Sequence, residues 1–79
     1  MRLYTPGERC NISGERIRSA RLERGMTQEH LAVQMQLRSL QIGQMAISRI
    51  ETGKRLVADF ELPPLADSLG VTVDWLLDI

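Results

Sequence analysis

The stretch "QIGQMAISRIETGKR", residues 41–55, gathers side chains that can donate or accept several hydrogen bonds. If it forms a helix, Ile47 and Ile50 share one face. The opposite face then carries an amide, a thioether, a hydroxyl and a guanidinium, on Gln44, Met45, Ser48 and Arg49. Such groups suit the recognition of a partner through directed contacts. The alternative is an ordinary solvated helix face.

Groups that could support catalysis or bind a metal are scarce along the chain. His30 is the only histidine and Cys10 the only cysteine, and no pair of acidic residues accompanies either one. A thiolate zinc site and an internal disulfide both need more cysteines than this chain has. We therefore expect no enzyme activity, no metal site and no cofactor, and we expect Cys10 to be a free thiol.

The composition is that of one small domain. Its 79 residues are 43% hydrophobic, which is enough for a single apolar core without the support of a disulfide or a metal. The first ten residues, "MRLYTPGERC", lack the apolar run of a signal peptide, and no apolar stretch is long enough to cross a membrane. We expect a soluble cytoplasmic protein that does not bind a membrane.

The charges are divided unequally along the chain, although the formal net charge is zero. Residues 1–55 carry all ten lysines and arginines and five glutamates, whereas residues 56–79 carry five acidic residues and no basic one. The first part is therefore able to face an anionic partner such as a nucleic acid. The alternative is a charged surface that only meets solvent.

Capping and turn signals predict three short helices in the first two thirds of the chain. Ser13 and Thr27 are expected to cap the first two helices, and Gly25 and Gly53 to end the first and the third. No stretch alternates apolar and polar residues as a half-buried strand would. We expect residues 1–12 to be a mobile arm before a domain of residues 13–79.

Two further helices are predicted in the last third. In "DFELPPLADSLG" the apolar residues recur at helical spacing, on Phe60, Leu62, Leu65, Ala66 and Leu69. Pro63 and Pro64 must occupy the first turn of this helix or bend it, because proline lacks a backbone donor. Thr72 is expected to cap the last helix. The predicted fold is therefore all-α, a compact bundle of five short helices.

Three segments of the chain together resemble a known family. They are "IRSARLERGMTQEHLA", "ISRIETGKR" and "FELPPLADSLGVTVDWLL", and the resemblance covers roughly residues 13–78. They are similar to the phage-repressor-type helix-turn-helix domain of the Cro/C1, or XRE, family. The resemblance implies a lambda-repressor-like fold and sequence-specific binding of double-stranded DNA, as in a transcriptional repressor of prokaryotic or phage type.

The resemblance also implies roles for individual residues. Base contacts are assigned to the exposed side chains of the third helix, Gln44, Met45, Ser48 and Arg49. Phosphate contacts are assigned to Gln28, Lys54 and Arg55. Arg21 and Glu51 are expected to form an internal ion pair with a structural role. Glutamine can bond adenine through two hydrogen bonds, arginine can bond guanine in the same way, and methionine can pack on a thymine methyl group.

Two features depart from the family pattern. The segment "LRSLQIG", residues 37–43, makes the connection between the second and third helices about five residues longer than a usual helix-turn-helix turn. Gly43 stands where serine or threonine commonly caps the third helix, a change that costs only a few tenths of a kcal/mol. We expect a loop in place of a tight turn, followed by an intact third helix.

One such helix contacts too few bases to select a site in a genome, so we expect a homodimer on an inverted repeat. The expected interface consists of apolar residues at the acidic end of the chain, Trp75, Leu76, Leu77 and Ile79. The alternatives are that these residues only close the monomer, or that the dimer forms only on DNA. A different function would be an antitoxin-like interaction module, in which the same scaffold holds a partner protein.

Overall fold

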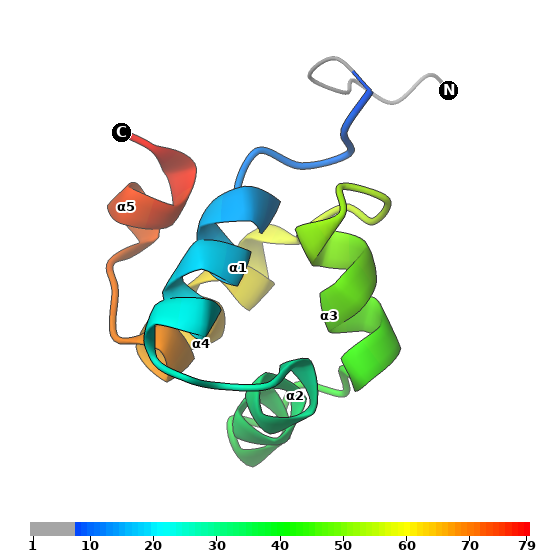
Figure 1. The fold of residues 1–79 in the computed structure, drawn as a ribbon, viewed down its shortest axis with the longest axis vertical. Coiled ribbons are helices and arrows are strands. Elements are labelled where there is room, and N and C mark those ends of the chain that lie inside the picture. Colours follow the sequence, from blue (N-terminus) through cyan, green and yellow to red (C-terminus); the bar gives the residue numbers. More distant parts are fainter. Residues whose placement is uncertain (1–7) are drawn as a thin grey trace.

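The computed structural model describes residues 8–79. Within this range the chain forms five α-helices and one short 3-10 helix, and no strand (Figure 1). In chain order they are α1 (Gly14–Glu23), α2 (Gln28–Leu37), α3 (Gln44–Glu51), η1 (Asp59–Glu61), α4 (Leu62–Leu69) and α5 (Val73–Leu77). The all-α prediction is confirmed. None of the helices in this range combines the length and the apolar character needed to span a membrane.

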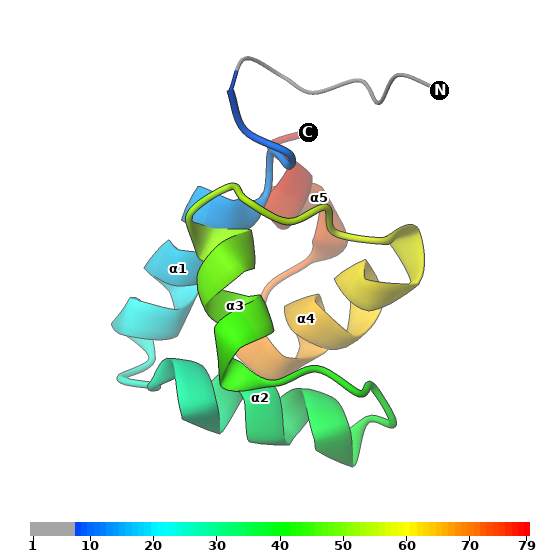
Figure 2. The ribbon, with the colours of Figure 1, turned by 90° about the vertical axis from the view of Figure 1, so that its right-hand side faces the viewer.

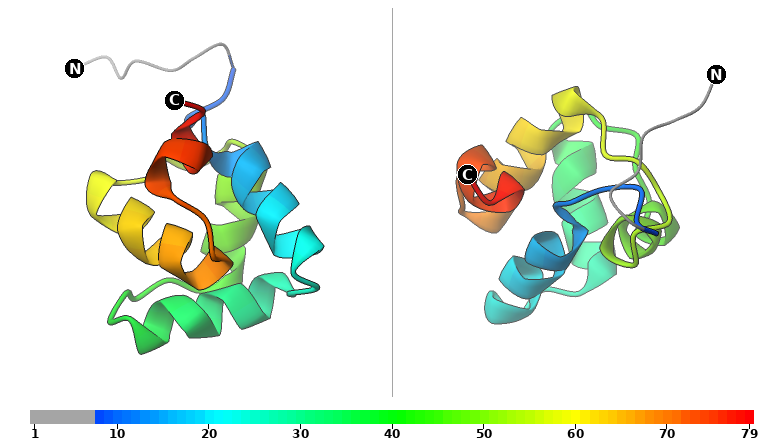
Figure 3. Two further views of the ribbon diagram at one scale, coloured as in Figure 1. Left: turned by 90° about the vertical axis from the view of Figure 1, so that its left-hand side faces the viewer. Right: turned by 90° about the horizontal axis from the view of Figure 1, so that it is seen from above.

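The helices enclose one hydrophobic core. α2 crosses below α1, α3 and α4, and α5 packs against α1 and α4 on the side away from α2 (Figure 1; Figure 3, left). Every helix contributes side chains without exposed surface, among them Ile17, Leu31, Met35, Ile47, Ile50, Leu65 and Leu76. Burial of an apolar side chain of this size stabilises the fold by about 1.5–3 kcal/mol. The core therefore fixes the inward face of α3.

Side-chain caps begin three of the helices. Thr27 and Thr72 each accept, through the hydroxyl oxygen, the backbone N–H three residues further on at 3.0 Å. Ser13 lies directly before α1, as predicted, but its side chain makes no capping hydrogen bond. Asn11 does so instead, because its Oδ1 accepts the backbone N–H of Gly14 at 2.7 Å. The prediction of Ser13 as the capping side chain is therefore wrong.

The connection between α2 and α3 is an ordered loop. Ser39 ends α2 in the left-handed conformation, with φ +69°, and the N–H of Leu40 donates to the carbonyl of Met35 at 3.0 Å. Gly25 and Gly53 end α1 and α3 in the same conformation, as predicted. Ile42 is only 3% exposed, so the longer connection contributes a core side chain of its own.

The prolines of the fourth predicted helix lie in the first turn of α4, directly after Leu62. Proline is compatible with this position because the first N–H groups of a helix have no partner inside it. Phe60 precedes α4, within η1, and is 67% exposed. The helical spacing of Phe60 with the core residues of α4 is therefore broken by the tighter turn of η1.

The apolar residues at the end of the chain have different environments. Leu76 is completely buried, so it cannot take part in the predicted dimer interface, and that part of the prediction is wrong. Trp75 is 37% exposed, and the guanidinium of Arg16 lies 4.6 Å from the centre of its ring. Leu77 is half-buried, and Ile79 is 84% exposed.

The part of the predicted N-terminal arm that the structure describes contacts the end of α3. The backbone N–H of Cys10 donates to the carbonyl of Gly53 at 2.8 Å, and Asn11 is only 8% exposed. Residues 1–7 of this arm lie outside the described residues. The division of the chain after residue 12 stays a prediction.

Candidate nucleic-acid interface

α3 presents the predicted base contacts on its uncovered face. Gln44 and Arg49 are exposed, and Met45 is 65% exposed. Ser48 lies on the same face and is half-buried. Figure 2 shows α3 running upward from α2 at the front of the molecule. Because α3 begins at Gln44, the first two of these residues lie in its first turn, the part of a recognition helix that meets base edges.

The side chain of Gln44 is held by a glutamine of α2. Gln44 Nε2 donates to Gln28 Oε1 at 2.6 Å, and Gln28 Nε2 donates to Glu51 Oε1 at 3.1 Å. A carboxylate only accepts hydrogen bonds, so Gln28 turns its amide nitrogen toward Glu51 and its carbonyl oxygen toward Gln44. Gln44 therefore keeps its own carbonyl oxygen and one N–H for an external partner.

Glu51, which accepts the hydrogen bond from Gln28, forms a buried ion pair with Arg21. Arg21 donates from Nε and Nη2 to the two carboxylate oxygens of Glu51, at 2.7 and 2.9 Å, and from Nη1 to the carbonyl of Met26 at 2.8 Å. The side chains of Arg21 and Glu51 are 9% and 1% exposed. The hydrogen bonds to Glu51 raise the pKa of Arg21, while burial opposes them. The pair joins α1 to the end of α3.

Lys54 and Arg55, the two basic residues after α3, have different surroundings. Arg55 donates from Nη1 and Nη2 to the two carboxylate oxygens of Glu61, each at 2.9 Å. These hydrogen bonds hold the pKa of the Glu61 carboxyl below its ordinary value, although burial acts in the opposite direction. Lys54 is exposed and forms no ion pair within residues 8–79. Its ammonium group is therefore available to a partner.

Two open hollows flank α3. One has a volume of about 350 Å³ and is lined by Met45, Ala46, Arg49, Lys54 and Arg55. The other has a volume of about 660 Å³ and extends from Gln44 to Thr27 and Gln28 at the start of α2. The first backbone N–H groups of a helix have no partner within it, and together with the helix dipole they attract anions. The predicted base contacts thus lie between the two sets of predicted phosphate contacts.

In the folded domain, several basic side chains of residues 1–55 form ion pairs with acidic side chains of residues 56–79. Three pairs cross between these parts, Arg16 with Asp78, Arg38 with Asp67 and Arg55 with Glu61, each at 2.8–2.9 Å. Arg49, like Lys54, forms no ion pair among the described residues. Among the described residues, two positive charges without an ion partner therefore lie on α3 and directly after it.

Sequence reasoning did not find the contacts of three residues that shape this surface. Glu61 holds Arg55, and both Arg9 and Asn11 donate to backbone carbonyls at the end of α3. The carbonyl partners of Arg9 and Asn11 lie 39–44 residues away along the chain, so no spacing rule could have found these contacts. Glu61 lies six residues after Arg55, across a loop whose path only the fold decides. No group of three histidine, cysteine, aspartate or glutamate side chains within residues 8–79 is arranged to hold a metal ion.

The geometry and a comparison with known families lead to one assignment. A family model described as helix-turn-helix matches residues 17–76, from the first half of α1 to α5. The matched segment includes α2, the loop after it and the whole of α3. The chain therefore belongs to the helix-turn-helix family of the Cro/C1, or XRE, type, whose members bind DNA.

Proposed function

We propose that this protein binds double-stranded DNA sequence-specifically and regulates transcription in the cytoplasm, as a repressor of prokaryotic or phage type. The observation that carries the proposal is the outer face of α3, where Gln44 is oriented by Gln28 and Arg49 forms no ion pair with any residue from 8 to 79. A major groove admits one helix, so this face would meet base edges while the flanking hollows meet the two phosphate backbones.

Gln44 is proposed to read adenine. Adenine presents an acceptor at N7 and a donor at N6 in the major groove, which match the N–H and the carbonyl oxygen that Gln44 keeps free. Arg49 lies one turn further along α3 and suits the two acceptors of guanine. Met45 would pack on a thymine methyl group, and Ser48 would bond a base or a phosphate.

The proposed phosphate contacts are Gln28, Lys54 and Arg55. The side chain of Gln28 is already bonded to Glu51 and Gln44, so its contact would come from the backbone N–H at the start of α2. Lys54 offers an exposed ammonium group. Arg55 shares its guanidinium with Glu61, so its contribution would be weaker than that of Lys54.

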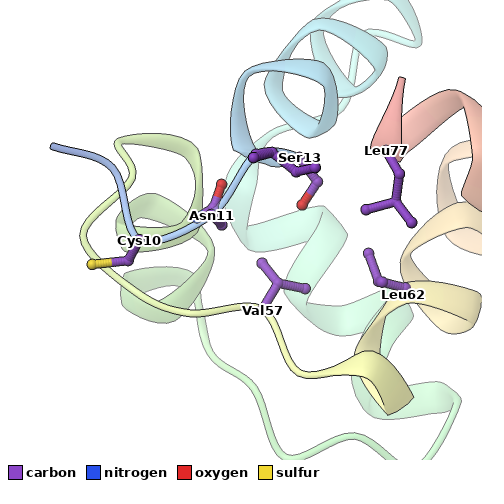
Figure 4. A pocket seen from close by; sticks show the side chains of 7 residues that line it. Cys10, Asn11, Ser13, Val57, Leu62 and Leu77 are labelled. Carbon is purple, nitrogen blue, oxygen red and sulfur yellow. The ribbon is translucent and has the colours of Figure 1, made fainter. Parts of the chain in front are cut away.

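A homodimer on an inverted repeat is proposed, with an apolar surface near α5 as the interface. A pocket of about 340 Å³ lies between the N-terminal segment, the loop after α3 and the helices α4 and α5 (Figure 4). Val57, Leu62 and Leu77 line it, beside Ile12, which is 60% exposed. This proposed interface leaves out Leu76, which is buried, and includes Ile12, Val57 and Leu62 instead. Leu77 belongs both to this interface and to the one expected from the sequence.

The experiment that tests DNA recognition is the selection of bound duplexes from a random pool. An enriched inverted repeat is expected, with binding that weakens steeply as salt rises because bound phosphates release counterions. A protein that binds no duplex at low salt would contradict the proposal. Such a result, with capture of a defined toxin-like partner instead, would favour the antitoxin-like module.

Single substitutions test the assigned contacts on the enriched duplex. Gln44→Ala and Arg49→Ala are expected to lose about 1–3 kcal/mol of discrimination each without a loss of thermal stability. Lys54→Ala should weaken binding to all sequences alike and reduce the salt slope by about one unit. Unaltered ratios of specific to random binding in the first two variants would show that α3 does not read bases as assigned.

The dimer is tested by sedimentation of the free protein and of the DNA complex. Leu77→Glu is expected to abolish the dimer, whereas the control Leu37→Glu changes a side chain that is 72% exposed at the end of α2 and should leave it intact. A monomer that occupies DNA singly, with Leu77→Glu binding as the natural protein does, would remove the dimer from the proposal.

A further inference from the structure

The segment Arg9–Asn11 lies outside the matched helix-turn-helix segment and crosses the C-terminal end of α3 (Figure 3, right). It makes four hydrogen bonds to carbonyls there. Arg9 Nη2 donates to Glu51 at 3.0 Å, the N–H of Cys10 to Gly53 at 2.8 Å, and Asn11 Nδ2 to Ile50 and Arg55 at 3.0 and 2.8 Å. Two of these carbonyls, those of Ile50 and Glu51, belong to the last turn of α3, and those of Gly53 and Arg55 belong to the loop that follows. The Ile50 carbonyl also accepts the N–H of Gly53 at 3.1 Å, so Asn11 adds a second bond there, and Arg9 supplies one to the carbonyl of Glu51.

Asn11 is the centre of these contacts. Its amide nitrogen bonds the end of α3 and the loop that follows, while its Oδ1 accepts the N–H of Gly14 at the start of α1. One buried side chain therefore joins three separate parts of the chain. Asn11 also lines the pocket of Figure 4, together with Val57 and Leu62.

Two glycines allow this close approach. A Cβ atom on Gly14 would collide with the carbonyl oxygen of Ile50 and lie 2.7 Å from Asn11 Oδ1. A Cβ atom on Gly53 would lie 2.8 Å from Arg9 Cζ. At Gly53 the Arg9 side chain therefore lies directly on the backbone, and at Gly14 the start of α1 lies directly on the carbonyl of Ile50, beside Asn11 and Arg9.

α3 depends on such support because it has only eight residues. A helix of this length is marginal in water without tertiary contacts, and its N-terminus has no side-chain cap. Arg49 lies in its last turn, and Lys54 lies three residues after its end. Two of the contacts proposed for DNA, Arg49 and Lys54, therefore sit on the part of the chain that Arg9–Asn11 holds.

We propose that Arg9–Asn11 positions the end of the recognition helix for DNA binding, and that Asn11 is its principal positioning residue. The inference rests on the proposed function for its DNA component. In the folded protein it predicts that loss of the Asn11 amide loosens residues 52–54 and weakens DNA binding, while the remainder of the core stays closed.

Asn11→Ser tests this role. Serine is too short to reach the carbonyls of Ile50 and Arg55, but its hydroxyl can still accept the N–H of Gly14. The matched control is Thr72→Ala, which removes a cap of α5 far from α3 and costs a comparable amount of stability. A second variant, Arg9→Met, keeps the aliphatic stem over Gly53 and removes the bond to Glu51 together with the exposed Arg9–Glu15 ion pair at 3.7 Å.

Two quantities are measured under conditions in which every variant is folded. They are the rates of amide hydrogen exchange and the affinity for a duplex that the natural protein enriches. For Asn11→Ser we expect about tenfold faster exchange of the N–H groups of residues 52–54 and about fivefold to twentyfold weaker binding. Arg9→Met should show the same pattern to a smaller extent. Thr72→Ala should affect exchange only in α5 and should change affinity less than about twofold.

The two readouts separate this inference from the proposed function. If Asn11→Ser exchanges like the natural protein at residues 52–54, or binds DNA no more weakly than Thr72→Ala does, the positioning role is overturned. If the natural protein enriches no duplex, the proposed function and the DNA component of this inference both fail. Faster exchange of Asn11→Ser, confined to residues 52–54, would then show that Arg9–Asn11 stabilises the end of α3 without a role in DNA recognition.

Discussion

Two arginine–glutamate pairs of this domain have the same bidentate geometry and different access to water. In the first, Arg21 and Glu51 have side chains that are 9% and 1% exposed, whereas in the second Arg55 is 34% and Glu61 6% exposed. Water screens a charge that it reaches, and desolvation makes an unpaired buried charge expensive. Loss of one partner should therefore cost far more in the first pair.

The two pairs also differ in what they are connected to. Glu51 accepts a hydrogen bond from Gln28 and through it orients Gln44, so the first pair links the core to the face of α3 that is proposed to read bases. Glu61 accepts the N–H of Ala58, and Arg55 donates to the carbonyl of Leu56, so the second pair organises only the loop between α3 and α4. The same chemistry thus orients Gln44 of the proposed base-reading face at one site and organises a loop at the other.

The largest effect is expected from Glu51→Gln. It leaves the buried guanidinium of Arg21 without a counter-charge and should lower the free energy of unfolding by about 3–5 kcal/mol, measured by urea denaturation. A loss below about 1 kcal/mol would show that water reaches this pair and would remove the contrast between the two sites.

Replacing both Arg21 and Glu51 separates the effect of this pair on stability from its effect on the orientation of Gln28. Arg21→Met combined with Glu51→Leu should recover most of the stability lost in Glu51→Gln, because apolar side chains of similar size avoid the cost of a buried charge. Base discrimination should not recover, since Gln28 then has no carboxylate to set its orientation. Binding ratios for the enriched and random duplexes measure this. Full recovery of both properties would show that Gln44 is oriented without Glu51.

A smaller effect is expected from Glu61→Gln. The expected loss of stability is about 1 kcal/mol, because Arg55 is partly solvated and keeps its bond to the carbonyl of Leu56. DNA binding should change little or increase slightly, since the guanidinium of Arg55 becomes available to phosphate. A loss as large as that of Glu51→Gln, in the same urea measurement, would contradict the ranking of the two pairs.

The smallest effect concerns pH. Because the pKa of Glu61 is lower in the folded protein than its ordinary value of 4.5, its contribution to stability is fully present above about pH 4.5 and is lost as the pH falls through the folded value. The difference in stability between the natural protein and Glu61→Gln should therefore be constant near neutral pH and shrink in acid. Urea denaturation of both proteins across this range measures it, and a difference that grows in acid would reverse the sign.

Local patterns predicted most of the helix boundaries. Thr27 and Thr72 cap helices through bonds that span three residues, and the glycines that end helices act through their own backbone conformation. Ser13 was assigned by the same rule and does occupy the N-cap position of α1, but its side chain makes no capping hydrogen bond, because the segment before it is held against α3. Asn11 is thereby placed so that it caps α1 in place of Ser13.

The sequence by itself determined that the chain is all-helical, that α3 turns Ile47 and Ile50 inward, and which polar residues lie opposite them. These features follow from periodicity and from interactions within a few residues. Only the tertiary structure decided that Gln28 orients Gln44 and that Glu61 forms an ion pair with Arg55. It also decided that Arg49 and Lys54 form no ion pair among the described residues. Hydrogen bonds and ion pairs act only over a few ångströms, and which distant residues come within that range depends on how the helices pack.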